Sequence, residues 1–145
     1  MTKKEYVAID EELLSKPLDP PENVSLLGCR CRSCEEVFFG KTAACWQCGS
    51  SDIEPTTLSR EGSLYSYTIM RNRPPGDYKG PDNPFEPFIA GLVELPEGIA
   101  ILAPIDGIDF EDVKINMKLK LSVEELYQDE SGRGVLAYKF RPQNT

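Results

Sequence analysis

The chain has 145 residues, a formal net charge of −8 at pH 7 and no histidine. Its length suits one domain of ordinary size or two small ones, and it lacks the run of about 18 apolar residues that predicts a membrane-spanning helix. The acidic balance disfavours nucleic-acid binding, which needs clustered Lys and Arg, and the absence of histidine removes the usual general base at neutral pH. Because the first residues, Met-Thr-Lys-Lys-Glu-Tyr, form no apolar stretch for secretion, we expect a cytoplasmic protein.

Residues 1–27 are predicted to be a docking segment, partly helical and partly irregular. Four apolar side chains between residues 5 and 16 fall near one face of a helix: Tyr6, Ile9, Leu13 and Leu14. Three prolines would end that helix: Pro17, Pro20 and Pro21. We expect the segment to dock on a neighbouring domain or on a partner chain.

Two pairs of cysteines follow and predict a metal site. Two residues separate the cysteines within each pair, and ten residues lie between the pairs: Cys31 and Cys34, then Cys45 and Cys48. This spacing can bring four sulfurs to the corners of a tetrahedron around one zinc ion, and without histidine the site would be all sulfur. Buried free thiols, two disulfides and an iron site are the alternatives, and disulfides are disfavoured in the reducing cytosol.

Three further residues near these pairs carry expectations. Cys29 lies too close to Cys31 to complete a pair, so we interpret it as a small packed residue, with an alternate metal ligand as the other interpretation. Gly49 follows the second pair, as suits a tight turn whose amides point at sulfur. Glu35 has the matching place after the first pair, which makes that turn less favourable.

Residues 28–55 are expected to form a zinc ribbon that is too small to build its own core, so that metal ligation replaces packing. Its aromatic residues are Phe38, Phe39 and Trp46. They either seal the ribbon against the next domain, which we favour, or contact a partner.

Residues 56–145 are predicted to form a small barrel. Five segments have the alternation or the apolar run of a strand: residues 64–69, 88–95, 99–105, 117–124 and 136–140. Turn signals at 74–76, 96–98 and 130–134 separate them, and residues 109–113 suit one short turn of helix. The predicted fold is therefore mainly β, a rubredoxin-like zinc ribbon followed by a five-stranded OB-fold barrel.

Five stretches of sequence carry a resemblance. They are Gly-Cys-Arg-Cys-Arg-Ser-Cys at 28–34, Cys-Trp-Gln-Cys-Gly-Ser at 45–50, Glu-Gly-Ser-Leu-Tyr-Ser-Tyr-Thr at 61–68, the strand and turn at 87–98, and Phe-Arg-Pro at 140–142. Together they resemble the zinc-ribbon/OB-fold proteins associated with acyl-CoA enzymes. The cysteines alone are common to many ribbons, but the combination is specific. One departure is that a proline-broken segment replaces the aromatic-rich helical lead-in common in the family.

The resemblance implies a non-catalytic subunit. Members of the family accompany a thiolase-like subunit, which holds the nucleophilic cysteine and the catalytic bases, and they help to shape its acyl-CoA site. We therefore expect a zinc-containing partner in the C–C cleavage of a 3-oxoacyl-CoA, with no activity of its own and with two copies of each chain in the complex. Benzoylsuccinyl-CoA, from anaerobic toluene breakdown, is one substrate that the resemblance suggests.

The long loop at residues 72–85 is where substrate contacts are expected, because long loops in compact domains often carry function. Arg71 and Arg73 at its root and Lys79 within it are candidates to bind CoA phosphates, with simple surface charge as the alternative. Four aromatic residues are candidates to line an acyl channel or to contact the partner: Phe38, Phe39, Tyr78 and Phe85.

Two other functions compete with this one. A nucleic-acid-binding module would use stacked exposed aromatics in a basic groove. The acidic charge opposes such a groove, although four residues supply aromatic rings: Tyr65, Tyr67, Phe38 and Phe39. A stand-alone acyl-CoA hydratase is the least favoured, because it would need a general base that the chain does not supply as histidine.

Overall fold

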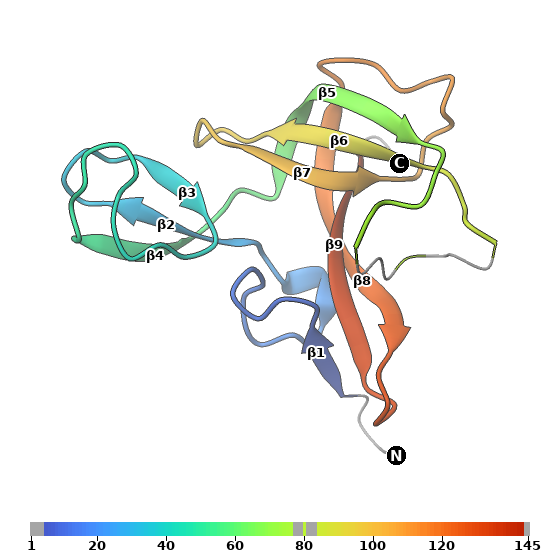
Figure 1. Ribbon diagram of the computed structural model, residues 1–145, viewed down its shortest axis with the longest axis horizontal. Coiled ribbons are helices and arrows are strands. Elements are labelled where there is room, and N and C mark those ends of the chain that lie inside the picture. The colour runs from blue at the N-terminus through green and yellow to red at the C-terminus, as the bar shows by residue number, and fades with distance from the viewer. Residues whose placement is uncertain (1–4, 77–79, 81–83, 144–145) are drawn as a thin grey trace.

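The computed structural model describes residues 5–76, 80 and 84–143, and Figure 1 shows two β modules in it. A three-stranded sheet forms the smaller module and a six-stranded sheet forms the larger. Its elements in chain order are β1 (Tyr6–Ala8), η1 (Pro21–Asn23), β2 (Leu27–Cys31), β3 (Val37–Phe39), β4 (Ile53–Thr57), β5 (Glu61–Met70), β6 (Phe88–Glu94), β7 (Ala100–Ile105), β8 (Lys118–Gln128) and β9 (Gly134–Pro142). No helix in the described part of the chain is long and apolar enough to cross a membrane.

The three-stranded sheet is the ribbon that the cysteine spacing predicts. β2 lies in the middle and pairs antiparallel with β3 on one side and with β4 on the other. β2 and β3 approach so closely at Gly28 that a Cβ there would lie 2.5 Å from the carbonyl oxygen of Phe38. A residue with a side chain would therefore force the strands apart.

The larger sheet closes into the predicted five-stranded barrel. Around the ring, β5 pairs with β6, β6 with β7, β7 with β9 and β9 with β8, and β8 returns to β5. β7 meets β9 in parallel orientation at a single pair, Ile105 opposite Phe140. All five predicted strands are confirmed, and their pairing closes the ring of an OB-fold barrel.

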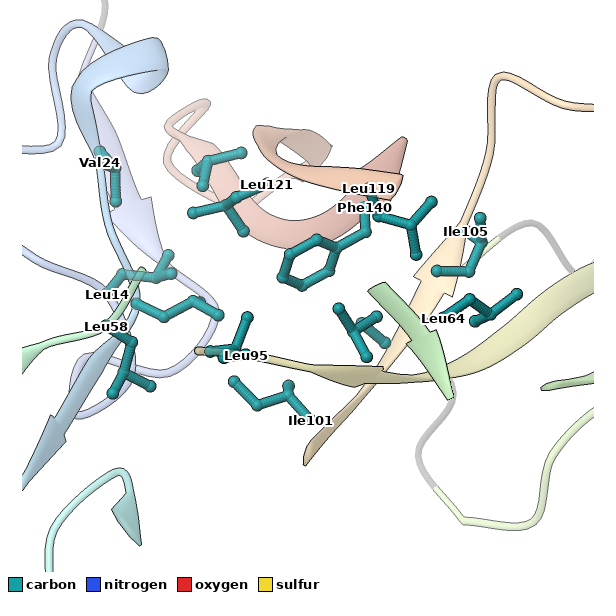
Figure 2. Close-up of a cluster of buried hydrophobic side chains, with 14 of the residues drawn as sticks. Leu14, Val24, Leu58, Leu64, Leu95, Ile101, Ile105, Leu119, Leu121 and Phe140 are labelled. Carbon is teal, nitrogen blue, oxygen red and sulfur yellow. The ribbon is translucent and has the colours of Figure 1, made fainter. Parts of the chain in front are cut away.

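Side chains on the inward face of each strand fill the barrel interior. Along β6, Ile89 and Val93 are buried while their neighbours in the strand are partly or fully exposed, the pattern of a strand with one face on the core. Figure 2 shows Phe140 in the middle of this cluster, with Leu119 and Ile105 beside it. Phe140 is 0% exposed, and burying a side chain of this kind contributes about 1.5–3 kcal/mol.

The prediction of a helix at residues 5–16 was wrong. β1 adds in parallel to the edge of β9 instead, and the amide of Ile9 donates to the carbonyl of Leu136 at 2.8 Å. Tyr6 and Val7 are aromatic and β-branched residues, which favour a strand. The open edge of β9 offers them backbone partners, whereas a short isolated helix is marginal in water.

The rest of the segment packs between the ribbon and the barrel. Leu14, Val24 and Leu26 are 0% exposed and belong to the main hydrophobic cluster, and Figure 2 shows Leu14 and Val24 on the same side of it as Leu58. The amide of Leu27 donates to the carbonyl of Leu13 at 2.7 Å. Residues before the ribbon therefore complete the core instead of extending from it.

Candidate metal centre and the surfaces around it

Four cysteine sulfurs converge in the ribbon. Cys31 ends β2 and Cys34 lies in the next turn, while Cys45 and Cys48 lie between β3 and β4. Their Sγ atoms all lie within 4.8 Å of one another, with Cys31 and Cys48 at 3.6 Å, Cys34 and Cys45 at 3.5 Å, and no disulfide. Zinc–sulfur bonds of about 2.3 Å in a tetrahedron place sulfurs about 3.8 Å apart. The cluster has nearly these dimensions, so the donor set fits one such ion.

The same backbone turn holds each cysteine pair. The amide of Glu35 donates to the carbonyl of Cys31 at 2.8 Å, and the amide of Gly49 donates to that of Cys45 at 2.9 Å. The residue after each pair has a positive φ, 68° at Glu35 and 77° at Gly49. A Cβ makes this conformation costly, so the first turn carries strain that glycine removes from the second.

The cysteine thiols differ in how readily they ionise. The backbone N–H of Cys34 lowers the pKa of Cys31 to about 6. At Cys34 the backbone N–H of Glu36 favours the thiolate, but burial and the neighbouring sulfurs outweigh it and raise the pKa to about 12. Four sulfurs this close cannot all be anionic without a balancing positive charge, which a divalent ion would supply.

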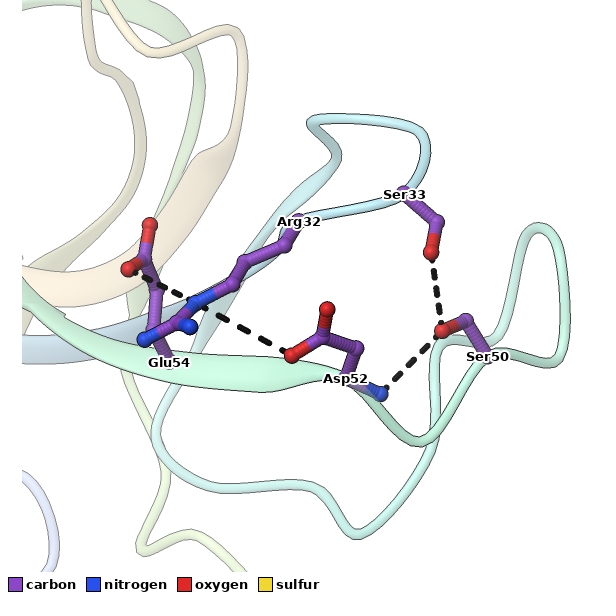
Figure 3. A network of polar contacts seen from close by, with 5 residues as sticks. All are labelled: Arg32, Ser33, Ser50, Asp52 and Glu54. Carbon is purple, nitrogen blue, oxygen red and sulfur yellow. Dashed lines mark hydrogen bonds and ion pairs between the residues drawn. The ribbon is translucent and has the colours of Figure 1, made fainter.

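A set of polar contacts links the two turns (Figure 3). Ser33 Oγ donates to Ser50 Oγ at 3.0 Å, and the amide of Asp52 donates to the same oxygen at 3.1 Å. Arg32 Nε lies 3.1 Å from the Glu54 carboxylate and 3.9 Å from that of Asp52. Exposed ion pairs contribute about 1 kcal/mol or less, so these contacts orient the turns more than they stabilise them. These contacts were not predicted from the sequence, although the residues lie close to the cysteines along the chain, which was the available signal.

Cys29 lies outside the sulfur cluster. It is in β2, opposite Phe38 on one side and Pro55 on the other, and its side chain is 3% exposed. Among the described residues, the group able to hold a metal consists of the other four cysteines. The structure therefore favours the packed residue over the alternate ligand.

The aromatic residues of the ribbon have different surroundings. Phe39 packs edge-on against Tyr138 of β9, with ring centroids 5.8 Å apart, and so joins the ribbon to the barrel. Phe38 makes an edge contact with Trp46 at 5.4 Å, and Trp46 itself is 81% exposed. Of the other channel candidates, Phe85 packs near Phe88, and Tyr78 lies outside the described residues.

The candidate CoA-binding residues are only partly brought together. Arg71 and Arg73 lie just after β5 and are exposed. The Arg71 guanidinium lies 5.9 Å from the centroid of the Phe110 ring, and Arg73 Nη1 donates to the carbonyl of Gly76 at 3.2 Å, within its own loop. Lys79 lies outside the described residues.

A cavity of about 540 Å³, lined by residues of β7, β8 and β9, is a feature that no segment of the sequence predicts. On its wall, Lys139 forms ion pairs with Asp106 and Glu124. Burial opposes the charge of Lys139, but the two carboxylates prevail and raise its pKa. The hydrogen bond from Lys139 in turn lowers the pKa of Glu124. The signal for this cluster, charged residues of β8 and β9 together with the residue that follows β7, appears only when the strands are paired.

Similarity to known proteins extends over both modules. The family model described as the C-terminal OB-fold domain of ChsH2 matches residues 56–124. A DUF35 domain-containing scaffold protein of Pyrococcus furiosus is 32% identical over 123 residues, which are 83% of this chain and 85% of that protein. The benzoylsuccinyl-CoA thiolase subunit BbsA of Thauera aromatica is 27% identical over 139 residues, 96% of this chain and 90% of BbsA. Among solved structures, the Ltp2-ChsH2(DUF35) aldolase is similar with a TM-score of 0.64 and 26% identity, covering 81% of this chain and 84% of the other.

Proposed function

The chain belongs to the DUF35 domain family, and from this membership we propose that it is a non-catalytic scaffold subunit of an acyl-CoA thiolase-type complex. A thiolase-like partner would carry the nucleophile and cleave a C–C bond of a 3-oxoacyl-CoA. One observation carries the proposal: relatives named as a scaffold protein and as a thiolase subunit match at least 83% of this chain and 85% of their own length. The match therefore includes the ribbon and the barrel together.

The residue types of the chain favour a non-catalytic role. It contains no histidine to act as a base near neutral pH. Its four clustered cysteines point at one another, so that a metal would engage all of them and leave no nucleophile. Catalytic groups would then come from the partner, while this chain contributes shape and binding surface.

We propose that Cys31, Cys34, Cys45 and Cys48 hold a structural zinc ion. Four sulfur ligands leave no open position for water or substrate, unlike a catalytic zinc site. The ion would join the two turns of a ribbon that has little core of its own. The ligands would be the four Sγ atoms, which lie 3.5 Å apart in one pair and 3.6 Å apart in another.

We also propose finer features that the family resemblance suggests. Arg71, Arg73 and Lys79 would contact CoA phosphates, and Phe38, Phe39, Tyr78 and Phe85 would contact the acyl chain or the partner. The complex would contain two copies of each chain, and benzoylsuccinyl-CoA is the proposed substrate.

Affinity purification of the tagged chain from its native host tests the assembly. We expect a thiolase-like protein to co-purify in a stoichiometric complex, identified by mass spectrometry, with one zinc per copy of this chain. Thiolysis of benzoylsuccinyl-CoA and of simple 3-oxoacyl-CoA thioesters would then be measured for the partner with and without this chain. Full activity of the partner alone, with no stable complex, would contradict the proposed function.

A further inference from the structure

The strand β9 has an unfilled position along one edge. Its other edge pairs with β8 from Gly134 to Pro142. On the first edge, β1 pairs with residues 134–136, and β7 pairs at Phe140. Residues 137–139 lie between these two contacts and pair with no described strand on that side. A stretch of three residues is about 10 Å long in a strand.

The backbone of Tyr138 faces this open position. The carbonyl of Leu136 accepts from the amide of Ile9, and the carbonyl of Phe140 accepts from the amide of Asp106, so both point to the edge away from β8. Because strand groups alternate with a period of two, the N–H and C=O of Tyr138 point the same way. Neither group is hydrogen-bonded to a described residue on that side. An extended peptide would supply the missing partners.

The cavity of about 540 Å³ lies at this position. Ile9, which follows β1, bounds it at one end, Pro104 and Ile105 of β7 bound the other, and Ala137 lies in its wall. Pro104 has no N–H to offer a neighbouring strand, as is usual for proline on a free strand edge. The cavity therefore adjoins the stretch of the β9 edge that no strand among the described residues covers.

The charges around the cavity select its occupant. Among the described residues of the lining, four have carboxylates, Glu86, Asp106, Glu124 and Glu125, and one has an ammonium group, Lys139. Lys139 is already engaged by two of them, and Arg141 Nε lies 3.1 Å from one of these two, Asp106, so the described rim still has more carboxylates than cations. Such a rim repels the phosphates of CoA and attracts Lys or Arg. The apolar part of the wall, which includes Phe88 and Leu126, suits an apolar side chain.

We propose that this cavity docks an extended segment of the catalytic partner, which adds a short strand beside Tyr138, inserts an apolar side chain and places Lys or Arg against the acidic rim. Strand addition of this kind takes affinity from the main chain and specificity from side-chain pockets. The inference rests on the proposed function, because the segment is taken from the thiolase-like subunit. It assigns the cavity to protein docking and not to the acyl-CoA substrate.

Two substitutions and two matched controls test the site in the reconstituted complex. Ala137→Phe fills the cavity and should weaken partner binding about tenfold, a typical effect of disturbing the centre of an interface. Glu86→Lys reverses an exposed rim charge and should weaken binding mainly at low salt. Ala100→Phe on β7 and Glu111→Lys on the β7–β8 loop lie outside the cavity lining and should change the Kd less than twofold. Thermal melting would establish that each variant is folded.

Crosslinking identifies the occupant directly. A benzophenone amino acid replaces Leu126, which is 40% exposed and lines the cavity, and, as a control, Leu102, which is 66% exposed and lies outside the lining. We expect position 126 to crosslink to a partner peptide with Lys or Arg next to an apolar residue, and position 102 to give no such product. A crosslink to acyl-CoA, or a raised KM for acyl-CoA in Ala137→Phe with unchanged partner affinity, would assign the cavity to substrate and overturn the inference.

The two proposals fail in different ways. If the unmodified chain forms no complex with a thiolase-like protein, the proposed function fails. If the complex forms but binds Ala137→Phe and Glu86→Lys as tightly as the unmodified chain, the docking site is wrong while the scaffold role stands.

Discussion

Replacing Gly49 by alanine isolates the contribution of one backbone conformation to metal binding. Gly49 follows the second cysteine pair with φ at 77°, and its amide closes that turn on the carbonyl of Cys45. No atom lies within 4 Å of the position that a Cβ would take, so the substitution adds strain without adding a clash.

The magnitude follows from two opposed terms. A left-handed conformation costs a residue with a Cβ about 1–2 kcal/mol, while the smaller freedom of alanine in the unfolded chain returns about 0.4–1 kcal/mol. The expected net loss is about 1 kcal/mol. Because about 1.4 kcal/mol corresponds to a tenfold change in an equilibrium constant, zinc affinity should fall about fivefold if the ribbon folds as the metal binds.

Competition with a chelator of known zinc affinity measures this change. Gly132→Ala is the matched control: it has φ at 81°, has no atom within 4 Å of its Cβ position, and lies in the turn between β8 and β9. Gly132→Ala should lower the melting temperature about as much as Gly49→Ala does, but it should leave the zinc affinity unchanged. Equal zinc affinity in Gly49→Ala and the unmodified chain would refute the reasoning, as would an equal loss in both variants.

Three further predictions concern the metal site, the core and the ion pairs. Cys34→Ser should abolish stoichiometric zinc in elemental analysis, whereas Cys29→Ser should retain the zinc. Cys29→Ser should lower the free energy of unfolding by about 1–3 kcal/mol, because its hydroxyl would be buried. Loss of zinc in both variants would contradict the assigned ligands. Phe140→Ala should lower the free energy of unfolding in urea by about 3–5 kcal/mol, and a loss below about 1 kcal/mol would mean that the barrel is not centred on this ring. The lowered pKa of Glu124, due first to its hydrogen bond with Lys139, provides stability that is present above the ordinary carboxyl pKa and is lost as pH falls through the lowered value. Lys139→Met should therefore destabilise the protein at pH 7, and its difference in unfolding free energy from the unmodified chain should shrink as the pH falls through the lowered Glu124 pKa. A difference independent of pH would show that the pair contributes nothing through this carboxyl.

The barrel strands and the cysteine turns were predictable because their signals are local. The alternation of Ile101 and Ala103 with exposed neighbours follows from a strand with one buried face, and the spacing of the cysteines directly limits how far apart their sulfurs can be. The positive φ of Gly49 was predictable for the same reason, since it depends on the turn alone.

Features that depend on distant parts of the chain were not predictable in the same way. Residues 5–16 have a weak helical pattern, but the edge of β9, more than a hundred residues away, decides that β1 is a strand. The cavity beside Tyr138 arises because β1 and β7 reach the same edge of β9 from opposite ends and leave a space between them. Nothing within any one segment indicates that space.

The burial of Leu14 and Leu26 between the ribbon and the barrel has a consequence for affinity. A partner that touches both Trp46 and the cavity would engage two surfaces held at a constant separation, so the second contact would form at a high effective concentration and without ordering a linker. A substitution that loosened this junction would then weaken the complex through entropy, although it removed no group that touches the partner.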